Sequence, residues 1–405
     1  MTWAHYFYGA KYSPQITQVN VDGGPLSTSC PTGDTCEAGY AGDIEVDGDI
    51  EQDLSVAPDA HIYVYDVPND ETGQTALDEY TAIANQDIAA TVSSSWGECE
   101  ADAGEAFAEA ENTVFEQMAM QGQSMFAASG DQGPYTCLVT DGTTRLNVFD
   151  PASQPWVIST GGTSLGTFNP ATNADPKYPL VGTETAWNPD NLCSDAAPSP
   201  GNDEEGGFFW CDFNAGTGGT GGGTGGSSQF WPAPSWQKGL GVINSFSTHG
   251  PGSCALATSQ ATLCREVPDV SANADQYTPY AEYCTGNSST VDSTCAILAD
   301  GGGLGTGGGW IKIAGTSMAA PIWASLIADR DAYQGGRAGN IGPLIYGWLA
   351  SPNYLTYFHD IAKPLPSLEK GVVPPTSNGL FPTTPGFDEA TGVGSPNFTA
   401  IITGA

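Results

Sequence analysis

Four apolar runs in the first half of the chain have the length and composition of buried β-strands. They cover residues 61–67, 90–96, 124–130 and 156–162, and they are rich in β-branched, aromatic and small residues. Continuous short apolar runs of this kind are typical of strands that are covered on both faces. The pattern therefore predicts a sheet whose strands lie in the interior of the protein.

Two longer segments have the spacing of helices. Residues 101–122 and 317–333 are rich in Ala, Glu, Met and Leu, and their apolar positions recur at helical spacing. Because the first of these segments lies between two predicted strands, the order strand–helix–strand predicts a parallel sheet covered by helices. In such folds functional sites lie at the carboxyl ends of the strands.

Glycine-rich stretches interrupt this pattern twice. Residues 191–228 are polar and include the Gly-rich loop 212–228, which we interpret as a surface loop. A second run, "DGGGLGTGGGW" at 300–310, is either another surface loop or a hairpin that leads into the segment around Ser317. We find no repeat of fixed period and no interdomain linker, so we expect one large α/β domain over 1–405.

The charge of the chain is strongly acidic. Forty-six acidic and 10 basic residues give a formal net charge of −36. This argues against nucleic acids and anionic membrane surfaces as partners, because they require basic patches. It suits a protein that stays soluble in acid, although a halophilic or simply acidic secreted protein fits the same composition.

The 10 cysteines fall mostly in close pairs, and none forms a Cys-x-x-Cys motif. Zinc is therefore disfavoured, and disulfides formed in an oxidising compartment are the better interpretation. No run reaches the ~20 apolar residues of a membrane helix. The first ten residues lack a basic segment followed by an apolar one, so they are not a signal peptide. The close pairs are Cys30/Cys36, Cys193/Cys211, Cys254/Cys264 and Cys284/Cys295, with Cys99 and Cys137 remaining.

Ser317 lies in "IAGTSMAAPIWASLIA", where a helical segment follows Gly315 and Thr316. Gly315 permits a tight turn, and Pro321 is acceptable if it lies in the first helical turn. A serine at a helix N-terminus would lie beside free amides that favour an oxyanion. The alternative is a plain helix start, with Thr316 or Ser317 as its N-cap.

A base for this serine is not obvious among the histidines. The chain has four, and none lies in a His-Gly-Thr-His type of setting. Glu45, Asp49 and Asp53 follow one another at i,i+4 spacing, so a helix would place them on one face. Carboxyls stacked in this way share protons in acid, where a carboxylate can replace histidine as the general base. A solvated acidic helix face is the structural alternative.

Asp131 lies in "AASGDQG", directly after a predicted strand and within a Gly-rich turn. The carboxyl end of a strand is where sites form in this fold class. An aspartate that only stabilises a turn is the common alternative.

These segments together resemble the sedolisin family of serine-carboxyl peptidases, and in particular its kumamolisin-like members. Single motifs are weak, because Gly-Thr-Ser-Met-Ala-x-Pro also marks subtilisins, but the ordered set over nearly the whole chain is specific. The resemblance rests on the Glu45-to-Asp49 spacing and on "APDAHIYVY", "SSSWG", "ASGDQG", "GGTSL", "ETAWN", "PAPSWQ", "VPDVSANAD", "GTSMAAP", "FHDI" and "PGFDEATGVGSP".

The resemblance implies a subtilisin-like parallel sheet flanked by helices, and an acid-acting endopeptidase that forms an acyl-enzyme. It implies Ser317 as nucleophile, Glu45 as general base and then acid, and Asp49 as the residue that orients Glu45. Asp131 would line the oxyanion hole, and Trp96 would lie in the hydrogen-bond network behind the triad. A protonated carboxyl can donate to an oxyanion, so the Asp131 role suits acid conditions.

The resemblance also implies one structural calcium ion near the C-terminus. Hard oxygen ligands from two loops are what calcium prefers, and the alternative is that the aspartates cap turns. The implied ligands are the carboxylates of Asp360 and Asp388 and the carbonyls of Ile361, Thr384 and Gly386.

Family members have a strand, carrying a glutamate, before the segment that matches the start of this chain, and their precursors have a prodomain. The domain is therefore expected to lack both. We expect a secreted monomer that acts on proteins or peptides, with its prodomain as partner in the precursor. A subtilisin is disfavoured by the absence of a suitable histidine and of Asp-Thr-Gly. The remaining alternative is a calcium-stabilised binding protein that kept the fold and lost activity.

Overall fold

A computed structural model describes most of the chain. The described residues are 1–24, 37–68, 73–138, 140–165, 184–188, 222–250, 252–257, 262–276, 278–284, 309–362 and 377–404, with only the backbone for 37–43 and 284.

The centre of the protein is a sheet of five strands. Its parallel strands lie in the order β11 (Val270–Asn273), β7 (Val157–Leu165), β5 (Ser124–Ala128) and β3 (Thr91–Ser94). The short strand β8 (Glu184–Ala186) pairs antiparallel with the end of β7. The carboxyl ends of the parallel strands therefore meet at one edge of the sheet.

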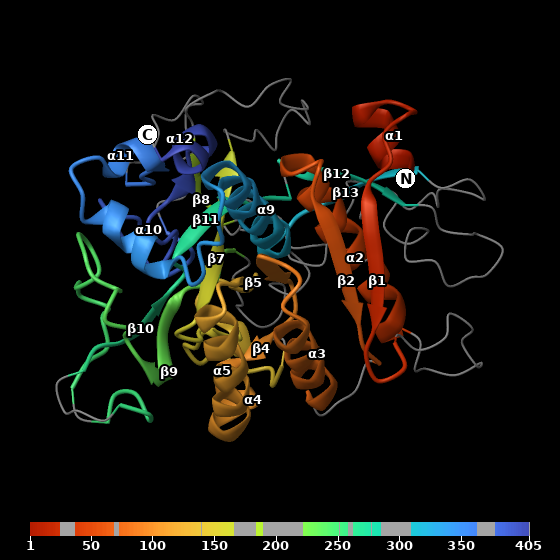
Figure 1. The fold of residues 1–405 in the computed structure, drawn as a ribbon. Helices are drawn as coiled ribbons and strands as arrows, with labels where there is room; N and C mark the ends of the chain where they lie inside the picture. The colour runs from red at the N-terminus through yellow and green to blue at the C-terminus, as the bar shows by residue number, and fades with distance from the viewer. Residues whose placement is uncertain are drawn as a thin grey trace, which may run out of the picture.

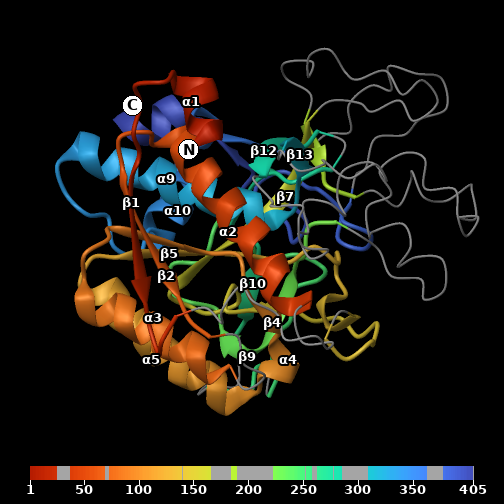
Figure 2. The same ribbon diagram turned by 90° about the vertical axis from the view of Figure 1, so that its right-hand side faces the viewer.

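Helices cover both faces of this sheet (Figure 1, Figure 2). Along β5 the side chains alternate: Phe126 packs with helix α9 (Thr316–Gln334), whereas Met125 and Ala127 pack with α3 (Gln74–Gln86) and α5 (Glu105–Met120). Because successive residues of a strand point to opposite faces, one apolar run serves two cores. This explains why the predicted strands have no polar alternation.

The other elements surround this three-layered centre. They are α1 (Thr2–Tyr8), β1 (Gln15–Asn20), α2 (Glu37–Val56), β2 (His61–Asp66), β4 (Glu98–Cys99), α4 (Glu100–Ala103), η1 (Thr136–Leu138), β6 (Phe149–Asp150), β9 (Gly226–Pro232), β10 (Cys264–Val267), β12 (Tyr280–Cys284), β13 (Gly309–Ile313), α10 (Gly342–Leu349), α11 (Tyr354–Tyr357), β14 (Phe358–His359), β15 (Ser395–Pro396) and α12 (Phe398–Thr403).

Three of the four predicted buried strands, in 90–96, 124–130 and 156–162, form the central sheet as β3, β5 and β7. The prediction for 61–67 is wrong in part. β2 is a strand, but in the described part of the chain it pairs only with β1, and its residues are half-buried or exposed. It lies outside the central sheet, with Ile62 packing on Trp3 and Leu54, so apolar composition alone overstated its burial.

Two other boundaries differ from the prediction. The segment 101–122 is two helices, α4 and α5, because Gly104 between them has φ +83°, which a helix cannot accommodate. Of the predicted Gly-rich loop 212–228, residues 212–221 lie outside the described residues, and Gly226–Ser228 begin strand β9, where they pair with β10. The second Gly run ends in β13, which pairs antiparallel with β12 and leads into α9, as the hairpin interpretation expects.

Two disulfides are present among the described residues. Cys254 pairs with Cys264, one of the close pairs, and the two remaining cysteines, Cys99 and Cys137, pair with each other. The other proposed pairs include residues outside the described part. None of the helices in the described residues is long and apolar enough to cross a membrane.

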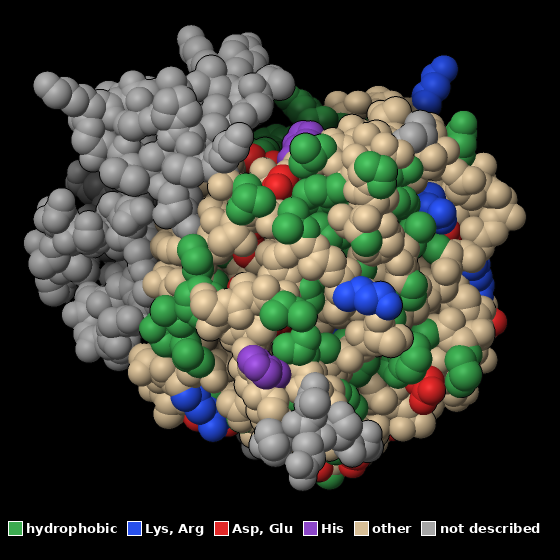
Figure 3. All heavy atoms as spheres, turned by 90° about the vertical axis from the view of Figure 1, so that its left-hand side faces the viewer, with side chains coloured by type: hydrophobic (Ala, Val, Ile, Leu, Met, Phe, Trp, Pro, Cys, Tyr) green, Lys and Arg blue, Asp and Glu red, His purple; other side chains and the backbone are tan. Residues whose placement is uncertain are grey.

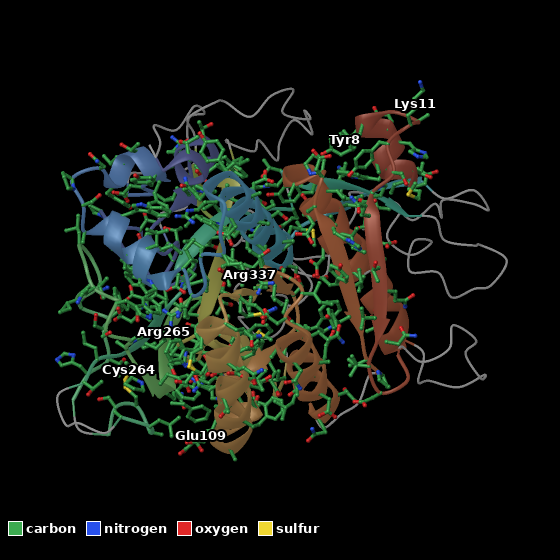
Figure 4. The ribbon with its side chains drawn as sticks, in the orientation of Figure 1. Tyr8, Lys11, Glu109, Cys264, Arg265 and Arg337 are labelled. Atoms are coloured by element: carbon green, nitrogen blue, oxygen red, sulfur yellow. A yellow bond between two sulfur atoms is a disulfide. The ribbon has the colours of Figure 1, made fainter. Side chains whose placement is uncertain are left out.

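Charges are distributed unevenly between surface and interior. On the face shown in Figure 3, hydrophobic side chains lie among few charged ones. In the interior, Arg265 on β10 forms an ion pair with Asp269, and both side chains are fully buried (Figure 4). Many carboxyls, described below, are buried without such a basic partner.

Candidate active site

Ser317 is the second residue of α9, in the first turn that follows β13. Gly315 before it has φ +120°, and a Cβ at this position would lie 2.7 Å from Oδ2 of Asp131. Only glycine combines this backbone conformation with this close approach. The turn therefore brings the start of α9 directly against the Asp131 carboxyl.

The sequence interpretation assumed that Pro321 lies in the first turn of the helix, but the structure places it further along. It is the sixth residue of α9, where an amide would normally donate to the carbonyl four residues earlier. That carbonyl belongs to Ser317. The proline therefore removes the usual helical donor from the backbone of Ser317.

Helix α2 packs along α9 (Figure 2). Glu45, Asp49 and Asp53 lie on its face toward α9. Asp53 accepts a hydrogen bond from the Ser325 hydroxyl of α9. The two helices approach closely at Gly48, where a Cβ would lie 2.8 Å from Cδ1 of Ile313 and 3.0 Å from Cε of Met318. The acidic face predicted from the i,i+4 spacing is thus an interface between helices.

The carboxyl of Glu45 contacts the hydroxyl of Ser317. Burial raises the pKa of Glu45 to about 7, hydrogen bonding by Ser317 and Ser95 lowers it, and the charge of Asp131 raises it. Its Oε1 is buried without a hydrogen-bond partner in the described part of the chain. Glu45 is therefore placed to take a proton from Ser317.

The link between Asp49 and Glu45 passes through Ser95. Oδ1 of Asp49 accepts a hydrogen bond of 2.7 Å from the Ser95 hydroxyl. Burial raises the pKa of Asp49 well above its ordinary value, and the charge of Glu45 raises it further, whereas the hydrogen bond from Ser95 lowers it. Asp49 thus lies next to Glu45, and Ser95 contacts both carboxyls.

Asp131 follows β5 and lies at the N-terminus of α9. Its Oδ1 accepts hydrogen bonds from the amide and the hydroxyl of Thr316, at 2.8 and 2.7 Å. Burial raises the pKa of Asp131, and the bonds from Thr316 oppose this. With Oδ1 held by Thr316, Oδ2 is the oxygen that can meet a ligand beside Ser317.

The sequence analysis did not identify Ser95. It expected the next residue, Trp96, in the hydrogen-bond network behind the triad. The side chain of Trp96 is 48% exposed, and no hydrogen bond of its indole is seen among the described residues. Ser95 occupies the position behind the carboxyls instead. The position of Ser95 directly after a predicted strand, in "SSSWG", could have indicated a site residue. The sequence alone does not show which of the serines at the strand end points toward the carboxyls.

Further acidic groups surround this site. Glu282 of β12 is fully buried, and its charge raises the pKa of Asp49. Burial raises the pKa of Glu282 to about 9, and Glu51 of α2 raises it further. Since carboxyls this close cannot all ionise, the region is built to hold protons.

The residues proposed for calcium also lie together. Gly386 donates its amide to Oδ2 of Asp360 at 3.2 Å, and Thr384 donates to Oδ2 of Asp388 at 2.8 Å. Burial raises the pKa of Tyr354, and the charges of Asp360 and Asp388 raise it further. Asp388 also accepts bonds from Ala390 and Thr391, so it caps the turn as the alternative expects. Oxygen donors from two loops fit a hard cation.

Comparison with known proteins agrees with this fold. The subtilase family model matches residues 38–335, and the chain belongs to that family.

Its relatives are serine-carboxyl peptidases of the sedolisin type. Kumamolisin of Bacillus sp. (strain MN-32) is 30% identical over 400 residues, covering 97% of this chain and 55% of that protein. Sedolisin of Pseudomonas sp. (strain 101) is 28% identical over 302 residues, covering 73% and 39%. The chain spans about half the length, or less, of these relatives.

The solved structure of Pseudomonas sedolisin, a serine-carboxyl proteinase complexed with two molecules of pseudo-iodotyrostatin, has the same fold. It superposes with a TM-score of 0.63 at 22% identity, covering 99% of this chain and 87% of that one. The predicted subtilisin-like parallel sheet flanked by helices is therefore confirmed.

Proposed function

We propose that this chain is an acid-acting serine-carboxyl endopeptidase that hydrolyses peptide bonds through Ser317, Glu45 and Asp49. The observation that carries the proposal is the contact between the Glu45 carboxyl and the Ser317 hydroxyl at the N-terminus of α9, opposite Asp131. The disulfides support a secreted protein.

The geometry supports a two-step acyl transfer. Oγ of Ser317 attacks the peptide carbonyl carbon as its proton moves to Glu45, and the C–N bond breaks as Glu45 gives that proton to the leaving amine. Water then attacks the carbonyl carbon of the acyl-enzyme as its proton moves to Glu45, and the bond to Oγ breaks as Glu45 returns that proton to Ser317. Protonated Asp131 and the Ser317 amide donate to the oxyanion in both steps.

Digestion of a denatured protein in acid tests this function. We expect cleavage that disappears in Ser317→Ala, and internal cuts in the peptide products rather than removal of short pieces from one end. A Ser317→Ala protein that still cleaves would refute the proposal. A folded wild-type protein that binds peptides without cleaving them would favour the binding-protein alternative.

Activity should peak on the acid side of neutrality. The rate rises as Glu45 ionises and falls as Asp131 loses its proton, and such a profile peaks midway between the two pKa values whichever is higher. Because burial raises the pKa of Glu45 to about 7 and that of Asp131 above its ordinary 3.8, the maximum should lie above the window on the order of pH 3–5 that carboxyls with ordinary pKa values would give. A kcat/KM profile that peaks above pH ~7.5 would contradict both roles.

Calcium should stabilise the fold, held by the carboxylates of Asp360 and Asp388 and the carbonyls of Ile361, Thr384 and Gly386. We expect Tm to rise with calcium concentration by mass action and to fall on chelation, before the intrinsic rate changes. Asp360→Asn is the cleaner variant, because Asp388 also caps its turn. It should abolish the calcium dependence of Tm. Equal wild-type Tm in calcium and in chelator would remove the metal from this proposal.

A further inference from the structure

The hydroxyl of Ser95 lies among three oxygen acceptors of the site. It is 2.7 Å from Oδ1 of Asp49 and 3.1 Å from the backbone carbonyl oxygen of Ser317, and it makes a hydrogen-bonding contact with Glu45. These oxygens come from both helices, α2 and α9. One side chain at the end of β3 therefore contacts the base, its neighbouring acid and the backbone of the nucleophile.

The carbonyl of Ser317 is available because of Pro321. In an uninterrupted helix the amide of residue 321 would donate to this carbonyl, and proline has no amide hydrogen. A buried carbonyl without a donor is costly. Ser95 supplies the missing donor from a different element, which ties the end of β3 to the turn that carries Ser317.

One hydroxyl cannot satisfy three acceptors, since it donates one hydrogen bond and accepts two. If it donates to the Ser317 carbonyl, the short contact with Asp49 requires a proton on Asp49. If it donates to ionised Asp49, the contact with Glu45 requires a proton on Glu45. Since the Ser317 carbonyl can only accept, all three contacts are satisfied at once only when both carboxyls are protonated, and when one of them is ionised the hydroxyl donates either to the carbonyl or to a carboxylate.

We propose that Ser95 is a positioning residue that holds Glu45 and Asp49 in register with Ser317 and couples the protonation of the two carboxyls. This proposal rests on the proposed peptidase function. When Ser317 transfers its proton to Glu45, the new Glu45 O–H can donate to Ser95, whose hydroxyl turns to Asp49. Asp49 is thereby linked to the base without direct contact, and no atom of Ser95 needs to meet the substrate.

Ser93, which lies on β3 two residues before Ser95, offers a matched control. Its hydroxyl is buried and has no hydrogen-bond partner in the described part of the chain. Ser93→Ala removes the same atom as Ser95→Ala, two residues earlier. Ser95→Thr keeps the hydroxyl and tests whether the hydrogen bonds, rather than the shape of serine, are needed.

The test measures kcat and KM across pH for this chain and these three variants. We expect Ser95→Ala to lower kcat about 10- to 100-fold, with KM within about twofold. The acid limb of the kcat profile should move to higher pH, because the hydroxyl stabilises the ionised carboxyls. Ser95→Thr should recover most of both effects, and Ser93→Ala should show neither. Other charged groups that act on the pair are Asp131 after β5, which acts on Glu45, and Asp53 of α2 and Glu282 of β12, which act on Asp49, and all are unchanged in every variant.

Two results would overturn the positioning role. One is a Ser95→Ala enzyme with the wild-type kcat and acid limb. The other is a Ser95→Ala enzyme whose rate falls only in proportion to a lost folded fraction, measured by thermal melting, with no recovery in Ser95→Thr. Either result leaves the peptidase function intact if wild type cleaves and Ser317→Ala does not. A wild type that fails to cleave at any pH would instead refute the proposed function itself.

Discussion

Ser317→Ala, Glu45→Gln and Asp49→Asn are each expected to lower kcat/KM by several orders of magnitude while leaving the fold intact. Members of a catalytic unit fail together, so a double variant should be little worse than Ser317→Ala alone. The physical reason is that Glu45 is the carboxyl in contact with the Ser317 hydroxyl, and Asp49 is buried beside it. Progress curves on a peptide substrate, with melting curves as the check on folding, measure the effect.

The histidines provide the control for this result. His61 lies on β2, where it stacks on Tyr63 and hydrogen-bonds to Thr17, away from α9. His61→Ala should retain acid activity. Wild-type-like cleavage by Glu45→Gln would refute the carboxyl base, and loss of chemistry in a folded His61→Ala protein would revive a histidine-dependent triad.

The free energy of unfolding is expected to fall by several kcal/mol between about pH 4.5 and pH 8. Burial raises the pKa of Glu51, Glu79 and Glu266 each to about 8, and that of Glu100 to about 7, from 4.5. The folded state therefore binds more protons than the unfolded chain in this window. The stabilisation is complete below about pH 4.5 and is lost as pH rises through the folded-state pKa values. Urea denaturation at a series of pH values measures it.

Glu111 offers the sharpest variant for this prediction. It is buried on α5, and both burial and the neighbouring Asp150 carboxylate raise its pKa. Glu111→Gln keeps a donor toward Asp150 and cannot ionise, so its stability should fall less steeply above pH 6 than that of wild type. Glu109 lies exposed on the same helix, and Glu109→Gln should not change the slope (Figure 4). Stability that increases from pH 4.5 to pH 8 would show that these carboxyls are not held protonated.

The central sheet could be predicted because its strands share one pattern, a continuous apolar run. β3, β5 and β7 are covered on both faces, so their apolar runs are continuous, and the helix between β3 and β5 has a clear period. β2 has the same composition, but its partner is β1, and composition cannot tell which strand lies beside which. Gly104 divides a helix that the period alone made continuous.

The carboxyl set could be predicted from spacing, since i,i+4 positions share a helix face whatever the face contacts. The sequence could not show that this face meets α9, nor that Asp53 bonds Ser325 there. Ser95 was missed because its role depends on a hydroxyl that joins two helices far apart in sequence. Trp96, expected in that network from resemblance, lies exposed beside it.

The close approach of α2 and α9 at Gly48 leaves little room between the helix that carries the base and the residues that flank Ser317. Helix α2, which carries the Glu45 and Asp49 carboxyls, approaches Ile313 and Met318 at Gly48. Ile313 lies before the turn that leads into Ser317, and Met318 lies after it. A side chain at position 48 would first push aside the ends of the Ile313 and Met318 side chains, and a larger one would press α2, and with it the base, away from the hydroxyl. The volume of the residue at position 48 can therefore tune the chemistry of this site. A smaller residue at 313 or 318 would compensate for a larger residue at 48.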